Sequence, residues 1–192
     1  MSKNFLINKK IFLVLLFIFF ILGCNKEGNE HSGGNEKLSE FFKHQPIKEI
    51  LDSLEGKNKL IMAIDINALE CQVCYDDFLN ICDELSEYFF KKNLKPPAML
   101  VIKEGSYLGL DQPERLEAWK KYNNINFPHV IISDSLFKYY GLKPIMALIY
   151  NNQENLIFAK EIPMKKKYRK IFFELLTNNQ TKNSNNYGNN KN

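Results

Sequence analysis

Metal ligands are scarce in this sequence. The chain has four cysteines and three histidines, and Cys71 and Cys74 are its one pair with CxxC spacing. A structural zinc site takes four ligands, usually from two such pairs or from a CxxC and a further Cys or His pair. The remaining candidates, Cys82, His44 and His129, stand at no recognisable ligand spacing. We therefore expect no metal and no cofactor.

The sequence also lacks the basic clusters of a nucleic-acid-binding surface. Its formal net charge is +4, but Lys3, Lys9 and Lys10 lie within the first 23 residues, which contain no acidic residue. Setting these three aside leaves +1 for the rest of the chain. No Lys or Arg cluster alternates with aromatic residues, as a stacking platform for single strands would require. We expect no nucleic-acid partner.

The apolar run at residues 11–22, IFLVLLFIFFIL, is too short for a typical membrane-spanning helix. It has twelve residues, whereas a spanning helix needs about 20. A basic segment with Lys9 and Lys10 precedes the run, and Gly23 and Cys24 follow it. This order is typical of an export signal. An uncleaved signal anchor with a free Cys24 is the alternative.

The segment ILGC, which ends at Cys24, resembles the lipobox of bacterial lipoproteins. The resemblance implies that residues 1–23 are a signal peptide and that Cys24 is acylated and becomes the first mature residue. Residues 24–37 would then be the lipid anchor and a flexible tether. We expect the rest of the chain on the extracytoplasmic side of a membrane, in the cell envelope, where disulfides are permitted.

From Leu38 onward the sequence alternates between helical and strand patterns. The predicted elements are helical residues 38–54 interrupted at Pro46, strand 59–66, helix 71–92, strand 98–102, a helix within 112–125, strand 129–133, a short helix at 134–142, a hairpin over 144–162 and helix 165–176. This order predicts an α/β sandwich of three layers, with helices on both faces of a mixed sheet. We assign residues 38–177 to this domain and expect the Asn-rich residues 178–192 to be disordered.

Cys71 and Cys74 fall where the first strand gives way to a long helix. The unpaired N–H groups and the dipole at a helix N-terminus stabilise a thiolate, so this position favours redox chemistry. We expect Cys71 to be the exposed nucleophile and Cys74 to lie behind it and resolve the mixed disulfide. Cys82 lies on the apolar stripe of the same helix, where a core thiol is the expectation.

The domain resembles the thioredoxin superfamily over residues 57–176. The resemblance rests on CQVC after a buried strand and on residues 141–144 before the strand IMALIY. It implies a thioredoxin-like fold with a cis-proline at Pro144 facing the CxxC. It also implies that the backbone of Lys143 hydrogen-bonds to an extended substrate segment, a mode that adds a strand to a sheet edge.

Within the superfamily the chain resembles the exported, membrane-tethered TlpA and ResA branch of thiol–disulfide oxidoreductases. That branch carries a carboxylate three residues after the second cysteine, where this sequence has Asp77. Positions three apart share a helix face, so we expect Asp77 to take the proton from Cys74. The partners implied are thiols or disulfides of exported proteins, a lipid membrane through Cys24, and a membrane redox partner that resets the pair.

The redox direction and one alternative function stay open. Glu70 would raise the pKa of Cys71 and Lys143 would lower it, and the sequence does not settle the balance. No Trp precedes Cys71, so a surface or binding lipoprotein that uses the disulfide as a permanent staple is an alternative. A peroxidase of the peroxiredoxin type is not expected, because the residues shortly before Cys71 lack a Pro and a Thr or Ser.

Overall fold

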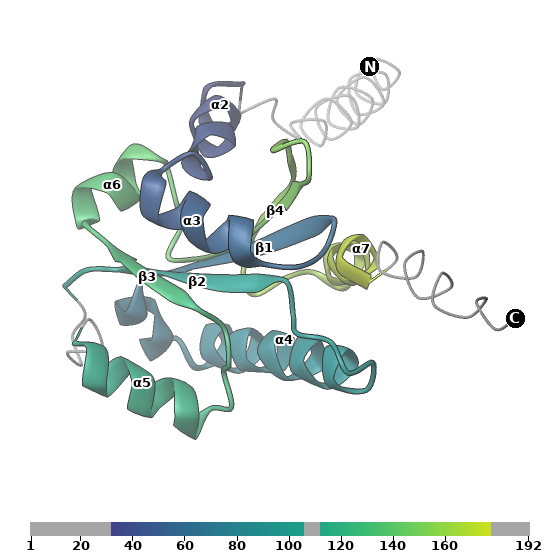
Figure 1. Ribbon diagram of the computed structural model, residues 1–192. Coiled ribbons are helices and arrows are strands. Elements are labelled where there is room, and N and C mark those ends of the chain that lie inside the picture. The colour runs from purple at the N-terminus through teal and green to yellow at the C-terminus, as the bar shows by residue number, and fades with distance from the viewer. Residues whose placement is uncertain (1–31, 106–111, 178–192) are drawn as a thin grey trace, which may run out of the picture. The chain divides into compact units, whose positions relative to one another are not determined.

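The computed structural model describes residues 32–105 and 112–177 (Figure 1). The elements in these ranges are α2 (Ser32–Phe41), α3 (Gln45–Ser53), β1 (Asn58–Ile64), the 3-10 helix η1 (Ile66–Glu70), α4 (Gln72–Phe90), β2 (Ala98–Lys103), α5 (Pro113–Tyr122), β3 (His129–Ile132), α6 (Asp134–Tyr139), β4 (Ile145–Asn151), β5 (Leu156–Glu161) and α7 (Lys166–Thr177). The order of helices and strands is the predicted one.

A five-stranded mixed sheet runs through the described part of the chain, in the order β3-β2-β1-β4-β5. β1, β2 and β3 are parallel, whereas β4 is antiparallel to β1 and β5 is antiparallel to β4. The near-continuous apolar runs of β1 and β2 suit interior strands covered on both faces, and both strands are almost entirely buried. The predicted edge hairpin is β4–β5.

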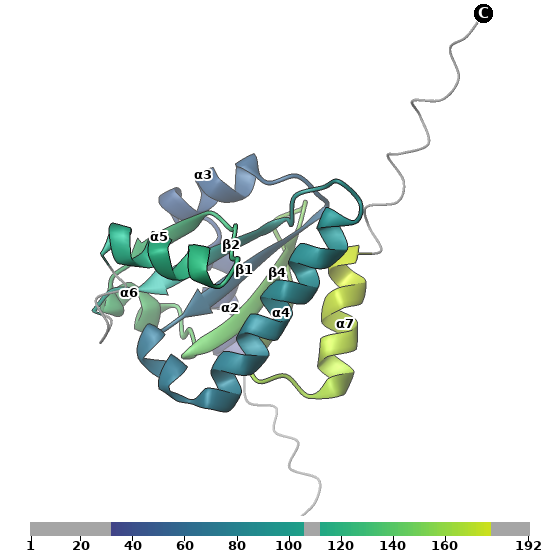
Figure 2. The ribbon, with the colours of Figure 1, turned by 90° about the horizontal axis from the view of Figure 1, so that it is seen from below.

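Helices cover both faces of this sheet, as Figures 1 and 2 show. Side chains of a strand alternate between the two faces, so Leu60, Met62 and Ile64 pack toward α4, α5 and α7. Ile61 and Ala63, from the same strand, pack toward α2, α3 and α6. The predicted three-layer α/β sandwich with a mixed sheet is confirmed.

The predicted tether ended at residue 37, but α2 begins at Ser32. Leu38, Phe41 and Phe42 are buried against the sheet and fix the later part of this helix. Adding residues to an existing helix costs much less free energy than starting one, so the helix extends backward into the polar segment. The predicted signal peptide, Cys24 and the tail 178–192 lie outside the described residues. None of the described helices combines the length and apolarity needed to cross a membrane.

Candidate functional site

Cys71 and Cys74 form a disulfide at the start of α4, with their Cα atoms 5.3 Å apart. The chain leaves β1, makes the 3-10 helix η1 and ends it at Cys71, whose N–H donates to the carbonyl of Ala68. Cys71 is also the N-cap of α4, and its carbonyl accepts the N–H of Tyr75. The pair therefore lies at a helix N-terminus, as the spacing predicted.

The two cysteines differ in exposure. Cys71 is exposed, whereas Cys74 is half-buried and packs against the core on the α4 side of the sheet. Val73, between them, is 66% exposed. An incoming thiol or disulfide can therefore reach Cys71 directly, and Cys74 lies on the inward side. The roles of attacking thiol for Cys71 and resolving thiol for Cys74 stay predictions.

Asp65, at the end of β1, organises the loop that leads to Cys71. Its carboxylate accepts the N–H of Asn67 at 3.1 Å and so caps η1. It also pairs with Lys103 Nζ at 2.6 Å, and Lys103 reaches Asp134 at 3.3 Å. The hydrogen bond to Asp65 is the main cause that raises the pKa of Lys103. The sequence pattern did not predict this charged group, although Asp65 directly follows the buried strand β1.

Pro144 lies next to this loop, but its peptide bond is not the predicted one. Its carbonyl accepts the N–H of Asp65 at 2.6 Å, which extends the β1–β4 pairing by one residue. Among the described residues, the cis peptide bond is the one between Ile162 and Pro163. The Lys143–Pro144 bond is trans, so the expectation of a cis-proline at Pro144 is wrong. Local turn geometry decides between the two isomers of an X–Pro bond, and the short GLKP approach does not reveal it. Lys143 and Pro144 are both exposed.

Asp77 points toward α7, where other groups hold both of its carboxylate oxygens. Oδ2 accepts the N–H of Met164 at 2.9 Å, and Oδ1 is paired with Arg169 Nη1. The second guanidinium nitrogen of Arg169 reaches Glu84 at 2.7 Å. We call Asp77, Glu84, Arg169 and the Met164 N–H the α4–α7 clamp. Each of the two Asp77 oxygens accepts one of these contacts and has a second lone pair, so the contacts do not prevent Asp77 from accepting the proton of Cys74, and that role stays a prediction.

Cys82 behaves as the predicted core thiol. It is a free cysteine, 1% exposed, among the side chains that α4 buries against the sheet. Burial raises the pKa of this thiol far above its usual value, because a thiolate would be poorly solvated there. Cys82 therefore lacks the thiolate character that reactivity requires.

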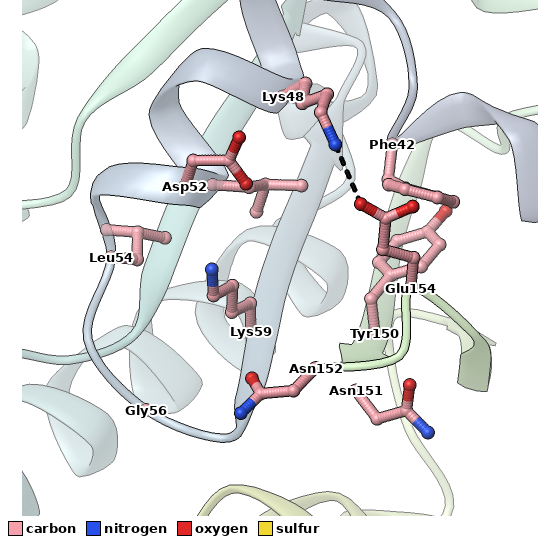
Figure 3. A pocket seen from close by; sticks show the side chains of 11 residues that line it. Phe42, Lys48, Asp52, Leu54, Gly56, Lys59, Tyr150, Asn151, Asn152 and Glu154 are labelled. Carbon is pink, nitrogen blue, oxygen red and sulfur yellow. Dashed lines mark hydrogen bonds and ion pairs between the residues drawn. The ribbon is translucent and has the colours of Figure 1, made fainter.

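Two further observations delimit the site. Within residues 32–105 and 112–177, no group of three or more His, Cys, Asp or Glu side chains is placed to hold a metal ion. A cavity of about 430 Å³ lies at the other end of β1, bordered by Lys59, α3 and the β4–β5 turn (Figure 3). Lys48 and Glu154 pair across it at 2.7 Å. Because the CxxC follows the opposite end of β1, this cavity is not part of the thiol site.

The chain matches no family model. It is similar to several solved structures. An exposed lipoprotein thioredoxin from Streptococcus pneumoniae has 15% identity, with 66% of this chain and 90% of that chain covered and a TM-score of 0.41. A thioredoxin-like protein from Aeropyrum pernix has 13% identity, coverage of 64% and 80%, and a TM-score of 0.41. An uncharacterized conserved protein from Geobacillus kaustophilus has 12% identity, coverage of 65% and 69%, and a TM-score of 0.42. Similarity at these levels of sequence identity and TM-score says nothing about the activity of this chain.

Proposed function

We propose that this protein is a thiol–disulfide oxidoreductase that uses Cys71 and Cys74. The observation that carries the proposal is the disulfide at the N-terminus of α4, with Cys71 exposed and Cys74 half-buried behind it. A permanent staple gains nothing from exposing one sulfur at a helix N-terminus. A redox pair needs that exposure, because its attacking sulfur must reach another protein.

In the reducing direction, the Cys71 thiolate attacks one sulfur of a substrate disulfide. A bond forms between Cys71 and that sulfur, and the other substrate sulfur leaves as a thiolate. The Cys74 thiolate then attacks the Cys71 sulfur, which releases the second substrate thiolate and closes the Cys71–Cys74 disulfide. Two electrons pass from the dithiol to the substrate. The same steps in reverse oxidise a substrate dithiol.

We propose that the substrates are exported proteins and that acylated Cys24 anchors the enzyme to a membrane on its extracytoplasmic side. The support is the order of basic segment, apolar run, Gly23 and Cys24 at the N-terminus. A membrane redox partner would reset the pair. The backbone of Lys143, exposed beside the Pro144–Asp65 hydrogen bond, is the proposed pairing site for an extended substrate segment.

The deciding experiment is a redox titration of the full-length chain in detergent. The protein is equilibrated across ratios of reduced to oxidised dithiothreitol, the free thiols are alkylated, and the peptides carrying Cys71, Cys74 and Cys82 are measured separately by mass spectrometry. We expect Cys71 and Cys74 to convert together and reversibly, with Cys82 unchanged throughout. A pair that resists reduction until the fold is lost would instead support a binding lipoprotein with a structural disulfide.

Single-cysteine variants test the assigned roles. Cys74→Ser should accumulate a mixed disulfide with a model peptide disulfide, because the resolving thiol is absent. Cys71→Ser should accumulate none and should lose at least about a hundredfold in the rate of disulfide reduction, since it lacks the accessible nucleophile. Cys82→Ser is the matched control for removing a thiol. Equal trapping by Cys71→Ser and Cys74→Ser would contradict the assignment.

The anchor has a test of its own. In a bacterial host labelled with a fatty-acid analogue, the wild-type chain should carry the label and sediment with membranes. Cys24→Ser should lose the label and stay in the soluble extracytoplasmic fraction, because one acylated residue is the expected attachment. Membrane retention of Cys24→Ser without label would favour an uncleaved signal anchor.

A further inference from the structure

Arg169, on α7, connects the C-terminal helix to the helix that carries the two cysteines. Figure 2 shows α7 beside α4, and the contacts of Arg169 with Asp77 and Glu84 join the two helices directly. Its side chain is 22% exposed and that of Asp77 is 16% exposed. The remaining oxygen of Asp77 accepts the Met164 N–H. This ion pair is therefore shielded from water on several sides, unlike the exposed pairs of the surface.

Asp77 is close to the redox pair because it follows Cys74 by three residues on α4, which places the two on neighbouring positions of one helix face. A carboxylate there disfavours a thiolate at the CxxC, and does so more strongly the closer it lies to the sulfurs. Arg169 pairs with this carboxylate from α7, 92 residues away in the sequence, and holds it toward that helix. The other acidic residue of this turn, Asp76, is exposed and accepts a hydrogen bond from Gln72, so solvent screens its charge more strongly.

We propose that Arg169 is a positioning residue of the thiol site. By fixing the Asp77 carboxylate on α7, it limits how closely that charge can approach the cysteine sulfurs, and so it shifts the equilibrium of Cys71 and Cys74 toward the dithiol. The inference rests on the proposed oxidoreductase function and adds to it a positioning residue on the C-terminal helix. Arg169 acts through Asp77, so its effect disappears when Asp77 is neutral.

The test is a double-mutant cycle on the dithiol–disulfide equilibrium, with the titration described above. Arg169→Gln should favour the disulfide by about three- to tenfold, which is about 15 to 30 mV toward a more negative midpoint for two electrons. Arg169→Lys should stay within about twofold of the wild type, because it keeps the charge. Lys170→Gln is the matched control, since Lys170 is exposed on the same helix and pairs with Glu174 at 3.8 Å.

The second arm removes the charge of Asp77. Asp77→Asn is nearly isosteric and keeps an oxygen for the Met164 N–H, so it should fold and should favour the dithiol by a similar factor. Adding Arg169→Gln to Asp77→Asn should change the equilibrium by less than about twofold. If the full Arg169→Gln shift persists without the Asp77 charge, the mechanism is wrong. If Arg169→Gln does not fold, an Asp77→Asn equilibrium equal to the wild type overturns the proposal by itself.

The same titration separates two kinds of failure. A wild-type chain whose disulfide never converts reversibly overturns the oxidoreductase function, and this inference falls with it. A wild-type chain that converts reversibly, with Arg169→Gln matching it, overturns only the role of Arg169.

Discussion

The two halves of α4 place the same residue type in opposite surroundings. In the first turn, Cys71 is exposed and is bonded to the half-buried Cys74. Two turns further along, Cys82 is 1% exposed and free. Both regions belong to one regular helix of 19 residues. The difference in chemistry therefore comes from where each turn lies relative to the sheet.

Helix periodicity explains how one helix contains both environments. Phe78, Ile81, Cys82, Leu85 and Phe89 form the face that α4 buries on the sheet. That face begins only at the second turn, so Cys71 and the first two residues of the helix remain exposed. The first turn also has unpaired N–H groups, which favour a thiolate, whereas the buried face disfavours any charge. A cysteine is reactive or inert here according to its position along the helix.

Truncation of side chains in the two halves gives the largest expected difference. Leu85→Ala removes a fully buried side chain and should lower the free energy of unfolding by about 2–5 kcal/mol. Val73→Ala, at a 66% exposed position between the cysteines, should change it by less than about 0.5 kcal/mol. Urea unfolding measures both. Equal losses would mean that the first turn is packed as tightly as the second half.

Substitutions of two neighbouring acidic residues extend the comparison within the first half of α4. Asp77→Asn should lower the free energy of unfolding by about 1–2 kcal/mol, because it weakens the α4–α7 clamp at a shielded position. Asp76→Asn, at an exposed position where the carboxylate accepts a hydrogen bond from Gln72, should change it by less than about 0.5 kcal/mol. The same urea titrations serve as the measurement. A larger loss from Asp76→Asn would reverse our assignment of the inward-facing acid.

The pH dependence of stability gives a smaller effect from the buried half. Burial raises the pKa of Cys82 in the folded state, whereas the unfolded thiol titrates near its ordinary value of about 8.5. Because only the folded state keeps Cys82 protonated at high pH, this thiol makes its full contribution to the free energy of unfolding below about pH 8.5. The contribution is lost as the pH rises above that value. The wild type should therefore lose about 1 kcal/mol relative to Cys82→Ala between pH 7 and pH 9. Denaturant titrations in reductant at both pH values test this, and parallel curves would contradict it.

Patterns within single segments predicted most of the fold. The apolar runs of β1 and β2 and the stripe from Phe78 to Phe89 each reflect a buried face, and such faces determine element type and layer. The position of the CxxC at the start of α4 followed from the same local reasoning. The start of α2 at Ser32 could not be predicted in this way, because a helix that extends through a polar segment shows no apolar periodicity there.

The surroundings of the cysteines were harder to predict, since they come from distant segments. Arg169 lies in the basic stretch KKKYRK, where nothing in the pattern separates it from lysines that face solvent. Lys103 ends a buried strand, but its pairing with Asp65 depends on the register of β1 and β2. The trans bond at Pro144 depends on a turn whose geometry the residue types do not encode. Contacts across the sequence, rather than residue types, distinguish this site.

The α4–α7 clamp also bears on the order in which the molecule is completed. A chain is synthesised from its N-terminus, so Cys71, Cys74 and Asp77 emerge while Arg169, 92 residues after Asp77, has yet to be made. Until α7 docks, Asp77 has neither the guanidinium nor the Met164 N–H as a partner. The cysteines and their long helix are therefore present early, but the charges around them reach their final arrangement only with the last helix. A nascent chain that ends at β5 has both thiols of the finished protein but lacks the charged groups that later surround them.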